Sequence, residues 1–329
     1  PGGIHAIWGR ARGGATPAPI SAGAALRIFT GAPVPPGADA ILIQENATRD
    51  GDLLMASADP LPVGRHIRAR ASDFARETLL LDSGARLGAA QVALAVLGGH
   101  GRVAVHRRPR VALLSTGNEL VPPGADTPPG MLPSSNAPML AALLADLPCD
   151  VMDLGIVSDD LDAMTAAFVR ATQADIILST GGASVGDHDL VRPAFAAAGG
   201  TLDFWKIRMR PGKPLMAGTL DKSLFLGLPG NPVSAFVTGA LFLLPLVRHL
   251  SGAARPLPFL TDAALASPLP ATGDRDDYLR AWRGIDGVVS VTSQDSAATA
   301  AMAKADCLIL RPAQSPPAQP GDRVTILPL

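Results

Sequence analysis

The sequence has few of the residues that build disulfide or metal frameworks. Its 329 residues include two cysteines, Cys149 and Cys307, which lie far apart in the chain. Such a pair provides no disulfide framework and no cysteine-based metal site, so a reducing, cytoplasmic location is expected. The histidines also lack metal-site spacing, and no nucleophile-elbow, P-loop or zinc-protease motif occurs.

Charge of one sign and long apolar runs are also missing. The formal net charge is -1, so no basic field is available to attract nucleic acid or an acidic membrane. No uninterrupted apolar run approaches the roughly 18 residues of a membrane span. The run over residues 235–247 comes nearest, but it contains Pro245. We therefore expect neither nucleic-acid nor membrane partners. Because the chain starts at Pro1 without a signal-like segment, we interpret its start as a truncation or a fragment boundary.

The sequence does contain enough apolar residues for several packed cores. Hydrophobic residues make up 47% of the chain and charged residues 17%, which argues for globular domains. The length predicts two or more of them. The composition divides the chain into a small β domain over residues 1–71, a linker region over 72–108, an α/β domain over 109–251 and a C-terminal β-barrel-like domain over 252–329.

The outer zones consist mainly of short β-type runs between Gly and Pro turns. Such runs occupy residues 26–29, 40–43, 288–291 and 324–327. The linker region contains one helical pattern, over residues 89–97, which Gly98 and Gly99 end.

Strand and helix patterns alternate in the α/β zone. The apolar run over residues 111–114 is typical of a strand that is buried on both faces. Further strands are predicted over 150–155 and 175–178, with helices over 136–147, from 159 onward, and over 190–198. This alternation predicts a mostly parallel sheet covered by helices, in three layers.

Polar loops follow the predicted strands, at the edge where open α/β sheets bind ligands. The first loop holds Thr116, Gly117 and Glu119, and it fits either a helix capping box or a ligand site. Asp159 and Asp160 open the next helix. One acid is enough for a cap, which leaves the other free for a metal or ligand.

The second loop, over residues 179–189, is rich in glycine, hydroxyl groups and acids. Its glycines let the backbone approach a ligand, and its hydroxyl and N–H groups can cradle an anion. Asp187 and Asp189 add negative charge at the same place, so a Mg²⁺ ion is implied between them and a phosphate. The alternative is a glycine turn with Asp189 as the helix N-cap.

Basic residues alternate along a third segment. Lys206, Arg208 and Arg210 are expected on one face of an extended run, with Lys213 following in a Pro-Gly turn. A solvated edge strand is the alternative. An apolar hairpin pattern follows directly, which favours a central element that binds phosphate or an oxyanion.

A fourth segment, residues 227–234, places a Pro-Gly turn before a proline that starts a helix. It predicts either a plain strand-to-helix turn or a close approach of the backbone to a ligand.

Taken together and in this order, these loops resemble the molybdopterin molybdenumtransferase family, which includes the C-terminal part of gephyrin. The matching stretches are residues 27–35, 115–120, 179–189, 210–214 and 227–234. The resemblance implies an elongated homodimer with a β domain, a linker domain, a molybdopterin-binding α/β domain and a C-terminal β-barrel-like domain. The family's N-terminal segment, with its Asp-Gly-Tyr-Ala signature, is not part of this chain.

The activity implied by the resemblance is insertion of molybdate into adenylylated molybdopterin with Mg²⁺-dependent release of AMP. Such a site would act by electrostatic positioning of the anionic groups. The resemblance implies a cytoplasmic protein that interacts with other molybdenum-cofactor assembly proteins. Two alternatives remain open, namely a molybdopterin adenylyltransferase, which shares the α/β domain, and a non-catalytic molybdopterin-binding protein.

The resemblance also implies roles for single residues. Glu119, Asp159 and Asp189 correspond to its metal and ligand carboxylates. Lys206, Arg210 and Lys213 correspond to the cations around the phosphates and the oxyanion. Asp73 corresponds to a further active-site acid. Contacts to the pterin substrate are expected from Thr116, Gly117, Ser179, Gly181, Gly182, Ser184, Gly186, Pro211, Gly212, Pro229, Gly230, Asn231, Pro232 and Ser234.

Overall fold

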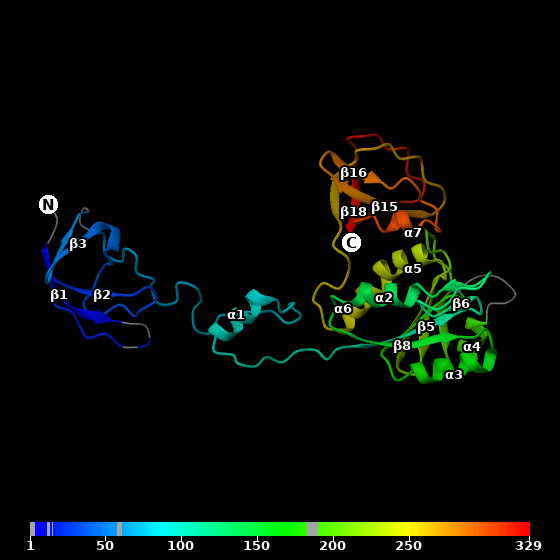
Figure 1. The fold of residues 1–329 in the computed structure, drawn as a ribbon, viewed down its shortest axis with the longest axis horizontal. Helices are drawn as coiled ribbons and strands as arrows, with labels where there is room; N and C mark the ends of the chain where they lie inside the picture. The colour runs from blue at the N-terminus through cyan, green and yellow to red at the C-terminus, as the bar shows by residue number, and fades with distance from the viewer. Residues whose placement is uncertain (1–3, 12–13, 15, 58–60, 183–189) are drawn as a thin grey trace. The chain divides into compact units, whose positions relative to one another are not determined.

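The computed structural model describes residues 4–11, 14, 16–57, 61–182 and 190–329. The chain forms two compact units, Pro1–Leu80 and Leu81–Leu329 (Figure 1). Each unit has its own sheet system and is described separately below.

The first unit contains a four-stranded sheet in the order β2-β1-β4-β3. Its strands are β1 (Ile4–Ala11), β2 (Ala24–Ile28), β3 (Ala47–Asp50) and β4 (Leu53–Ala56), with the short helix η1 (Gln44–Asn46) before β3. Strands β1 and β2 run parallel, and the other pairs are antiparallel. The strand predicted near residues 26–29 is confirmed. The one predicted over 40–43 is wrong, because that stretch forms no strand and leads into η1.

The second unit begins with the linker helix α1, which spans Ala89–Leu97 as the sequence predicts. Gly98 closes it, and Gly99 follows with a φ of 88°. That left-handed conformation is the usual reason for glycine just after a helix.

A six-stranded sheet forms the centre of the second unit, in the order β10-β12-β13-β9-β5-β8. The strands are β5 (Arg110–Thr116), β8 (Asp150–Val157), β9 (Ile176–Thr180), β10 (Thr201–Phe204), β12 (Met216–Leu220) and β13 (Ser223–Leu228). Strand β12 is antiparallel to both of its neighbours, and the other pairs are parallel. The predicted mostly parallel sheet is confirmed.

Helices cover both faces of this sheet. Figure 1 shows α3 (Leu161–Ala171) and α4 (Val191–Ala197) on one side, with α2 (Asn136–Leu144), α5 (Pro232–Thr238) and α6 (Leu244–Leu250) on the other. Alternate residues of the buried strands serve the two layers: Ile177 packs with α3 and α4, whereas Leu178 packs with α2 and α6. The three-layer architecture follows from these two cores.

Helices α5 and α6 are joined by the π-helical turn η2 (Gly239–Leu243) into one helical run, Pro232–Leu250. By length and mean hydropathy this run could cross a membrane. The expectation concerned uninterrupted apolar runs, and polar residues such as Ser234, Thr238 and Arg248 interrupt this one. More than half of it is buried inside the protein, where Leu243 and Val247 pack in the core under the sheet.

The C-terminal part forms a second six-stranded sheet, in the order β11-β15-β17-β18-β14 with β16 paired to β15. Its elements are β11 (Met209–Arg210), β14 (Thr261–Ala264), β15 (Asp276–Gly284), β16 (Gly287–Ser290), α7 (Thr299–Met302), β17 (Cys307–Arg311) and β18 (Arg323–Pro328). One face packs on α5, through Leu308, Leu327 and Val237. The strands predicted near residues 288–291 and 324–327 are confirmed.

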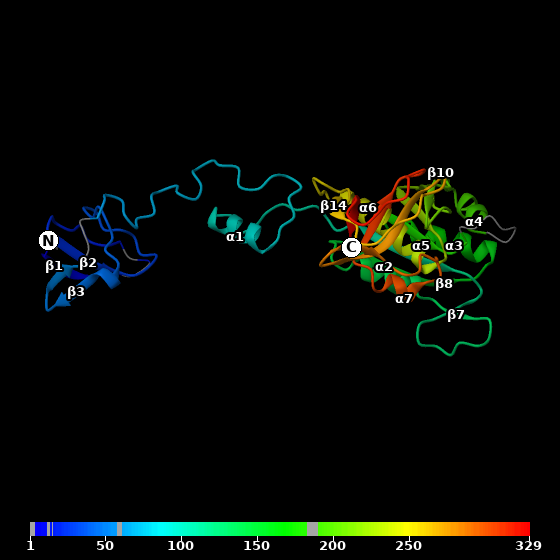
Figure 2. The ribbon, with the colours of Figure 1, turned by 90° about the horizontal axis from the view of Figure 1, so that it is seen from above.

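A short parallel pair, β6 (Leu120–Val121) and β7 (Leu132–Pro133), lies beside the α/β sheet. Figure 2 shows the connection between these two strands projecting away from the body of the unit. The chain then enters α2.

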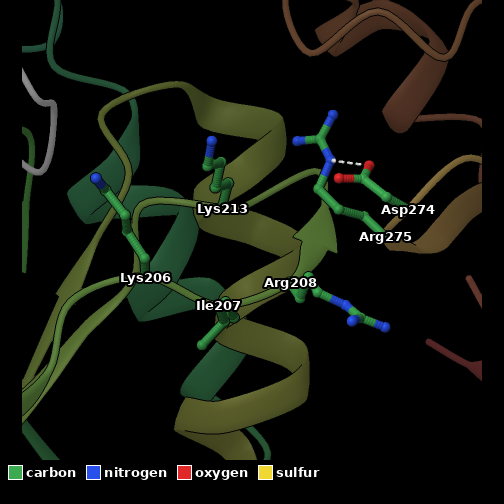
Figure 3. Close-up of a pocket in the computed structure, with 6 residues that line it drawn as sticks. All are labelled: Lys206, Ile207, Arg208, Lys213, Asp274 and Arg275. Atoms are coloured by element: carbon green, nitrogen blue, oxygen red, sulfur yellow. Dashed lines mark ion pairs between the residues drawn. The ribbon is translucent and has the colours of Figure 1, made fainter.

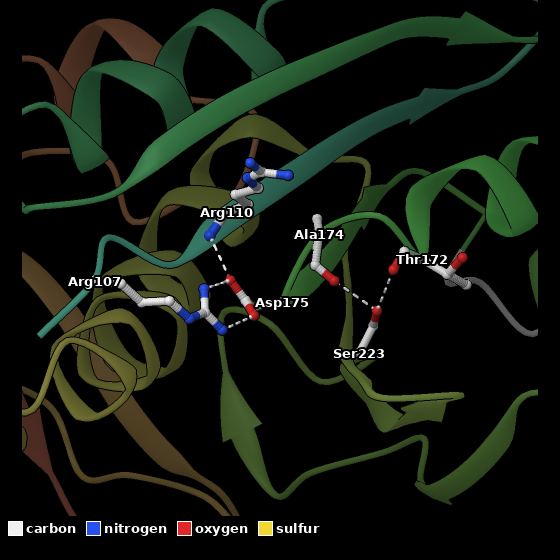
Figure 4. A network of polar contacts seen from close by, with 6 residues as sticks. All are labelled: Arg107, Arg110, Thr172, Ala174, Asp175 and Ser223. Carbon is white, nitrogen blue, oxygen red and sulfur yellow. Dashed lines mark hydrogen bonds and ion pairs between the residues drawn. The ribbon is translucent and has the colours of Figure 1, made fainter.

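Ionic and hydroxyl contacts tie the amino edge of the α/β sheet together (Figure 4). Arg107 donates to both carboxylate oxygens of Asp175, at 2.7 and 2.5 Å, and the backbone N–H of Arg110 donates to the same carboxylate at 2.8 Å. These hydrogen bonds, above all those from Arg107, hold the pKa of the Asp175 carboxyl below its usual range. Ser223 donates to the carbonyl of Ala174 at 2.6 Å. These contacts lie at the end of the sheet away from the polar loops, which are at its carboxyl edge.

Candidate functional site

The carboxyl ends of β5, β8, β9, β10 and β13 all lie at one edge of the α/β sheet, because these strands are parallel to one another. Strand β12 runs the opposite way and therefore begins at the same edge. The described parts of the four polar segments singled out in the sequence begin at these strand ends. For those parts, the expectation that they share the carboxyl edge of the sheet is confirmed.

The first loop turns away from β5 without starting a helix, so the capping-box interpretation of Thr116 and Glu119 is wrong. Gly117 has a φ of 141°, and a Cβ atom there would lie 2.4 Å from the carboxylate of Glu119. Thr116 itself is buried and donates to the carbonyl of Thr180 at 3.4 Å. Glycine at this position thus makes room for the exposed carboxylate of Glu119.

Asn118 connects the first loop to the loop after β8. Its backbone N–H donates to Asp159 Oδ2 at 3.1 Å, and the backbone N–H of Asp159 donates to Asn118 Oδ1 at 3.0 Å. Asp160 caps helix α3 by accepting from the N–H of Ala163 at 2.8 Å. The two neighbouring acids therefore have different roles: Asp160 caps its helix, and the exposed side chain of Asp159 is bonded to the loop that carries Glu119.

The described part of the glycine-rich loop, residues 179–182, packs tightly against its neighbours. A Cβ atom on Gly181 would lie 2.3 Å from the carbonyl oxygen of Thr116, and one on Gly182 would lie 2.4 Å from Val191. Ser179 is fully buried, and its hydroxyl has no hydrogen-bond partner among the described residues. The predicted roles of Ser184, Gly186, Asp187 and Asp189 fall on residues outside those that the structure describes.

Asn136, at the start of α2, joins the second and fourth loops. Its Nδ2 donates to Thr180 Oγ1 and to the carbonyl oxygen of Gly230, each at 2.7 Å. Its Oδ1 is buried and has no partner within the described part of the chain. No local pattern in the sequence indicates a role for Asn136, because both of its partners are distant in the chain.

The fourth loop starts α5 with local capping chemistry. Asn231 accepts hydrogen bonds from the N–H groups of Val233 and Ser234, at 3.1 and 3.4 Å, and Pro232 occupies the first helical position. Pro229 and Ser234 are buried. A Cβ atom on Gly230 would lie 3.3 Å from Gly181 Cα, so the backbones of the second and fourth loops approach each other closely here. The predicted approach to a ligand stays a prediction.

The basic segment opens into a hollow of about 420 Å³. Its lining consists of Lys206, Ile207, Arg208, Lys213, Asp274 and Arg275. Figure 3 shows Lys206 and Lys213 pointing to the same side, whereas Arg208 points away from both. Arg275 reaches the hollow from the C-terminal domain and pairs with Asp274 at 3.8 Å. No sequence pattern connects Arg275 with the basic segment, because it lies in a different zone of the chain.

Two expectations for this segment need correction. Arg210 lies on β11, which pairs with β15 at the edge of the C-terminal sheet, so the basic run is not a central element. Lys206, Arg208 and Arg210 are all exposed, as an edge strand predicts, but Figure 3 shows that Lys206 and Arg208 do not point to one side.

The Pro-Gly turn after this strand packs against α5. The Arg210–Pro211 peptide is cis, and Gly212 has a φ of 104°. A Cβ atom on Gly212 would lie 2.4 Å from the side chain of Thr238, in α5. The turn therefore connects the hollow to the helix that the fourth loop begins.

No group of three or more metal-binding side chains comes together within the ranges that the structure describes. Glu119 and Asp159 lie on adjacent loops, and Asp189, the third predicted ligand, is outside those ranges. Asp73 belongs to the first unit, so its contribution stays a prediction.

The fold and this edge together define a class: an α/β protein that presents carboxylates and cations from separate loops at the ligand-binding edge of its sheet. Three family models match most of the chain. Residues 4–99 match the MoeA N-terminal region (domain I and II), residues 112–249 a probable molybdopterin binding domain, and residues 262–329 the MoeA C-terminal region (domain IV).

Known proteins also match this chain over most of its length. The chain is 34% identical to the molybdopterin molybdenumtransferase of Haemophilus influenzae over 92% of its own length and 77% of that protein. It is 36% identical to the molybdopterin molybdenumtransferase of Nostoc over 79% of its length and 61% of that protein. A molybdopterin biosynthesis MoeA protein from Pyrococcus horikoshii superposes with a TM-score of 0.79 at 27% identity, over 99% of this chain and 81% of the other. The chain belongs to the molybdopterin molybdenumtransferase family, whose members are transferases of molybdenum cofactor biosynthesis.

Proposed function

We propose that this chain inserts molybdate into adenylylated molybdopterin and releases AMP in a Mg²⁺-dependent step. One observation carries the proposal, namely that acidic and basic loops lie at the same edge of one sheet. Glu119 and Asp159 come from the loops after β5 and β8, while Lys206 and Lys213 lie between β10 and β12. A pyrophosphate-bearing substrate needs both kinds of group, because its phosphates attract cations and its metal needs carboxylates.

The carboxylates fit a Mg²⁺ site that the substrate completes. Mg²⁺ is commonly held by one or two protein carboxylates together with substrate phosphates and water, and Glu119 and Asp159 are exposed acids of that kind. When bound, the ion supplies positive charge at the phosphates. Asn118 fixes Asp159 through two hydrogen bonds, so that carboxylate is ordered without a ligand.

The cations of the hollow have a separate task. Four cationic residues line the hollow, against the single carboxylate of Asp274: Lys206, Arg208, Lys213 and Arg275. This excess favours a doubly charged oxyanion such as molybdate, or the phosphates of the substrate. The protein would work by holding anionic groups in place while an oxygen of water or of molybdate attacks the phosphoanhydride, its P–O bond breaks and AMP leaves, with no covalent intermediate on the protein.

The proposal includes the compartment and the oligomeric state of the protein. We propose a cytoplasmic homodimer that meets other molybdenum-cofactor assembly proteins, which the family resemblance supports. Both cysteines among the described residues are free thiols, in keeping with a reducing compartment.

The test is AMP release from adenylylated molybdopterin, measured with Mg²⁺ and molybdate together and with each one omitted. We expect release that needs both ions and is lost in Glu119→Ala. Asp126→Ala removes an exposed acid from the connection between β6 and β7 and is the matched control. Release that ignores molybdate would contradict the proposal, and pterin binding without any release would indicate a non-catalytic binding protein.

A further inference from the structure

Trp205, which directly follows β10, is in contact with two cations. The Nζ atom of Lys206 lies 3.8 Å from the centre of the indole ring, and the guanidinium carbon of Arg192 lies 4.2 Å from it. Cations at these distances are attracted by the electrons of the ring face, and tryptophan is the strongest such partner. The ring is therefore a fixed point for a lysine that lines the basic hollow.

The backbone on both sides of Lys206 is anchored. Trp205 is half-buried and packs against the core beneath α3 and α4, whereas Ile207 packs against the core on the opposite face of the sheet. The N–H of Ile207 also donates to the carbonyl of Lys213 at 3.1 Å. The chain thus crosses the sheet edge at Lys206, and the freedom left to this residue is in its side-chain torsions.

A long lysine side chain is otherwise costly to order. Its flexible stem loses rotamer freedom when a ligand fixes the ammonium group. Contact with a ring that the core holds restricts those torsions in advance. Arg192, exposed on the first turn of α4, adds a second contact to the same ring.

We propose that Trp205 is a positioning residue, which holds the ammonium group of Lys206 at the rim of the basic hollow before an anionic ligand arrives. The inference deepens the proposed function and rests on it for its consequence in catalysis. The indole contacts no reacting atom and acts through Lys206. Loss of an exposed cation–π contact changes an equilibrium by about two- to fivefold, and this is the size of effect expected on ligand affinity.

The chain offers a direct test of the contact, because it contains four lysines, Lys206, Lys213, Lys222 and Lys304. In protein labelled with ¹³C-lysine, NMR should show one ε-methylene signal displaced upfield by the indole ring current. That signal should disappear in Lys206→Met and return to the position of the others in Trp205→Leu. Trp282→Leu, a substitution of another partly exposed tryptophan, should leave it unchanged.

Four coincident lysine signals in the wild type, or a displaced signal that survives Trp205→Leu, would overturn the inference. Should Trp205→Leu fail to fold, Trp205→Phe keeps an aromatic ring in the core and should reduce the displacement without abolishing it. Neither result depends on turnover, so this test stands even if the proposed function fails.

The kinetic test uses molybdate-dependent AMP release. We expect Trp205→Leu to raise KM by about two- to fivefold with little change in kcat, and Trp205→Phe to recover part of the loss. The double variant Trp205→Leu/Lys206→Met should be no worse than Lys206→Met alone, because the ring acts through the lysine. Additive losses would overturn the inference, since a general packing defect would produce them. Wild-type protein without any AMP release would instead count against the proposed function.

Discussion

Asn118 and Asp159 hold two loops of the α/β sheet together by exchanging hydrogen bonds, backbone N–H to side-chain oxygen in both directions, at 3.1 and 3.0 Å. Asn118, in the loop after β5, thereby holds the carboxylate of Asp159, in the loop after β8. Asp160, the next residue, faces its own helix instead and caps it. Two adjacent acids therefore offer a matched comparison.

We expect Asp159→Asn to lose at least about tenfold in AMP release, since a charge contact is worth about 1.5–3 kcal/mol. Its stability should change little, because asparagine keeps the acceptor oxygen for the N–H of Asn118. Asp160→Asn should retain both activity and stability, since asparagine caps a helix about as well as aspartate. Thermal unfolding and the AMP assay check both variants. Equal activity of the two variants would exclude a special role for Asp159.

Gly117 offers a second test, because its missing side chain makes space for a carboxylate. A Cβ atom there would lie 2.4 Å from Glu119 Oε2. Glutamate can swing aside, so Gly117→Ala should displace the carboxylate and reduce AMP release by at least about tenfold, since small misplacements of catalytic groups are costly. The backbone strain, about 1–3 kcal/mol, should appear in urea unfolding.

Gly130→Ala is the control for that strain. Gly130 has a φ of 85°, and a Cβ atom there would meet open space. It should lose stability for the same reason and keep its activity. If both alanine variants lose activity equally, the space beside Glu119 is not what Gly117 contributes.

The sequence predicts the layers of the α/β domain and the sheet edge that carries the polar loops. It does not predict which residues of different domains contact one another. The apolar run at residues 111–114 predicts a buried strand, since each face of a covered parallel sheet needs apolar side chains. Loops after such strands share one edge, so Glu119 and Asp159 could be placed together. Thr116 looked like a helix cap because its spacing to Glu119 is local, yet the chain forms a strand instead.

The segment at residues 206–210 shows the limit more clearly. Its alternation predicts an extended chain with exposed cations, and they are exposed. Periodicity does not say which sheet a strand joins, and β11 pairs with β15 of the C-terminal sheet. That pairing brings Arg275 to the hollow, a contact that no local pattern encodes. Asn136 escaped notice for the same reason, as both of its partners are distant in sequence.

Arg275 should contribute to oxyanion affinity from its place in the hollow. We expect Arg275→Met to raise the apparent KM for molybdate about tenfold with little change in kcat, because a lost charge contact costs at least about 1.4 kcal/mol. Molybdate titrations of AMP release at low ionic strength measure the effect. Arg283→Met is the control, since Arg283 also pairs with an acid, Asp306, but does not line the hollow. The same KM in both variants would remove Arg275 from the site.

The contact between Arg107 and Asp175 predicts how the free energy of unfolding depends on pH. Hydrogen bonds from Arg107 lower the pKa of the Asp175 carboxyl in the folded state. A carboxyl with a depressed folded pKa stabilises the protein above its unfolded pKa of about 3.9, and this stabilisation is lost as pH falls through the folded value. Arg107→Met should therefore lower the urea midpoint most at neutral pH, and the difference from wild type should shrink as the pH falls below about 4.

Arg108→Met is the control for this prediction, because Arg108 and Asp150 lie 3.8 Å apart with both side chains largely exposed. Exposed pairs of this kind contribute about 0–1 kcal/mol, so its urea midpoint should stay close to that of the wild type throughout. A pH-independent difference for Arg107→Met would show that the arginine acts through packing of its stem and not through the charge of Asp175. Asp175→Asn separates the two further, since it removes the charge but keeps an acceptor for the N–H of Arg110. The unfolding of this variant should be less sensitive to acid than that of the wild type.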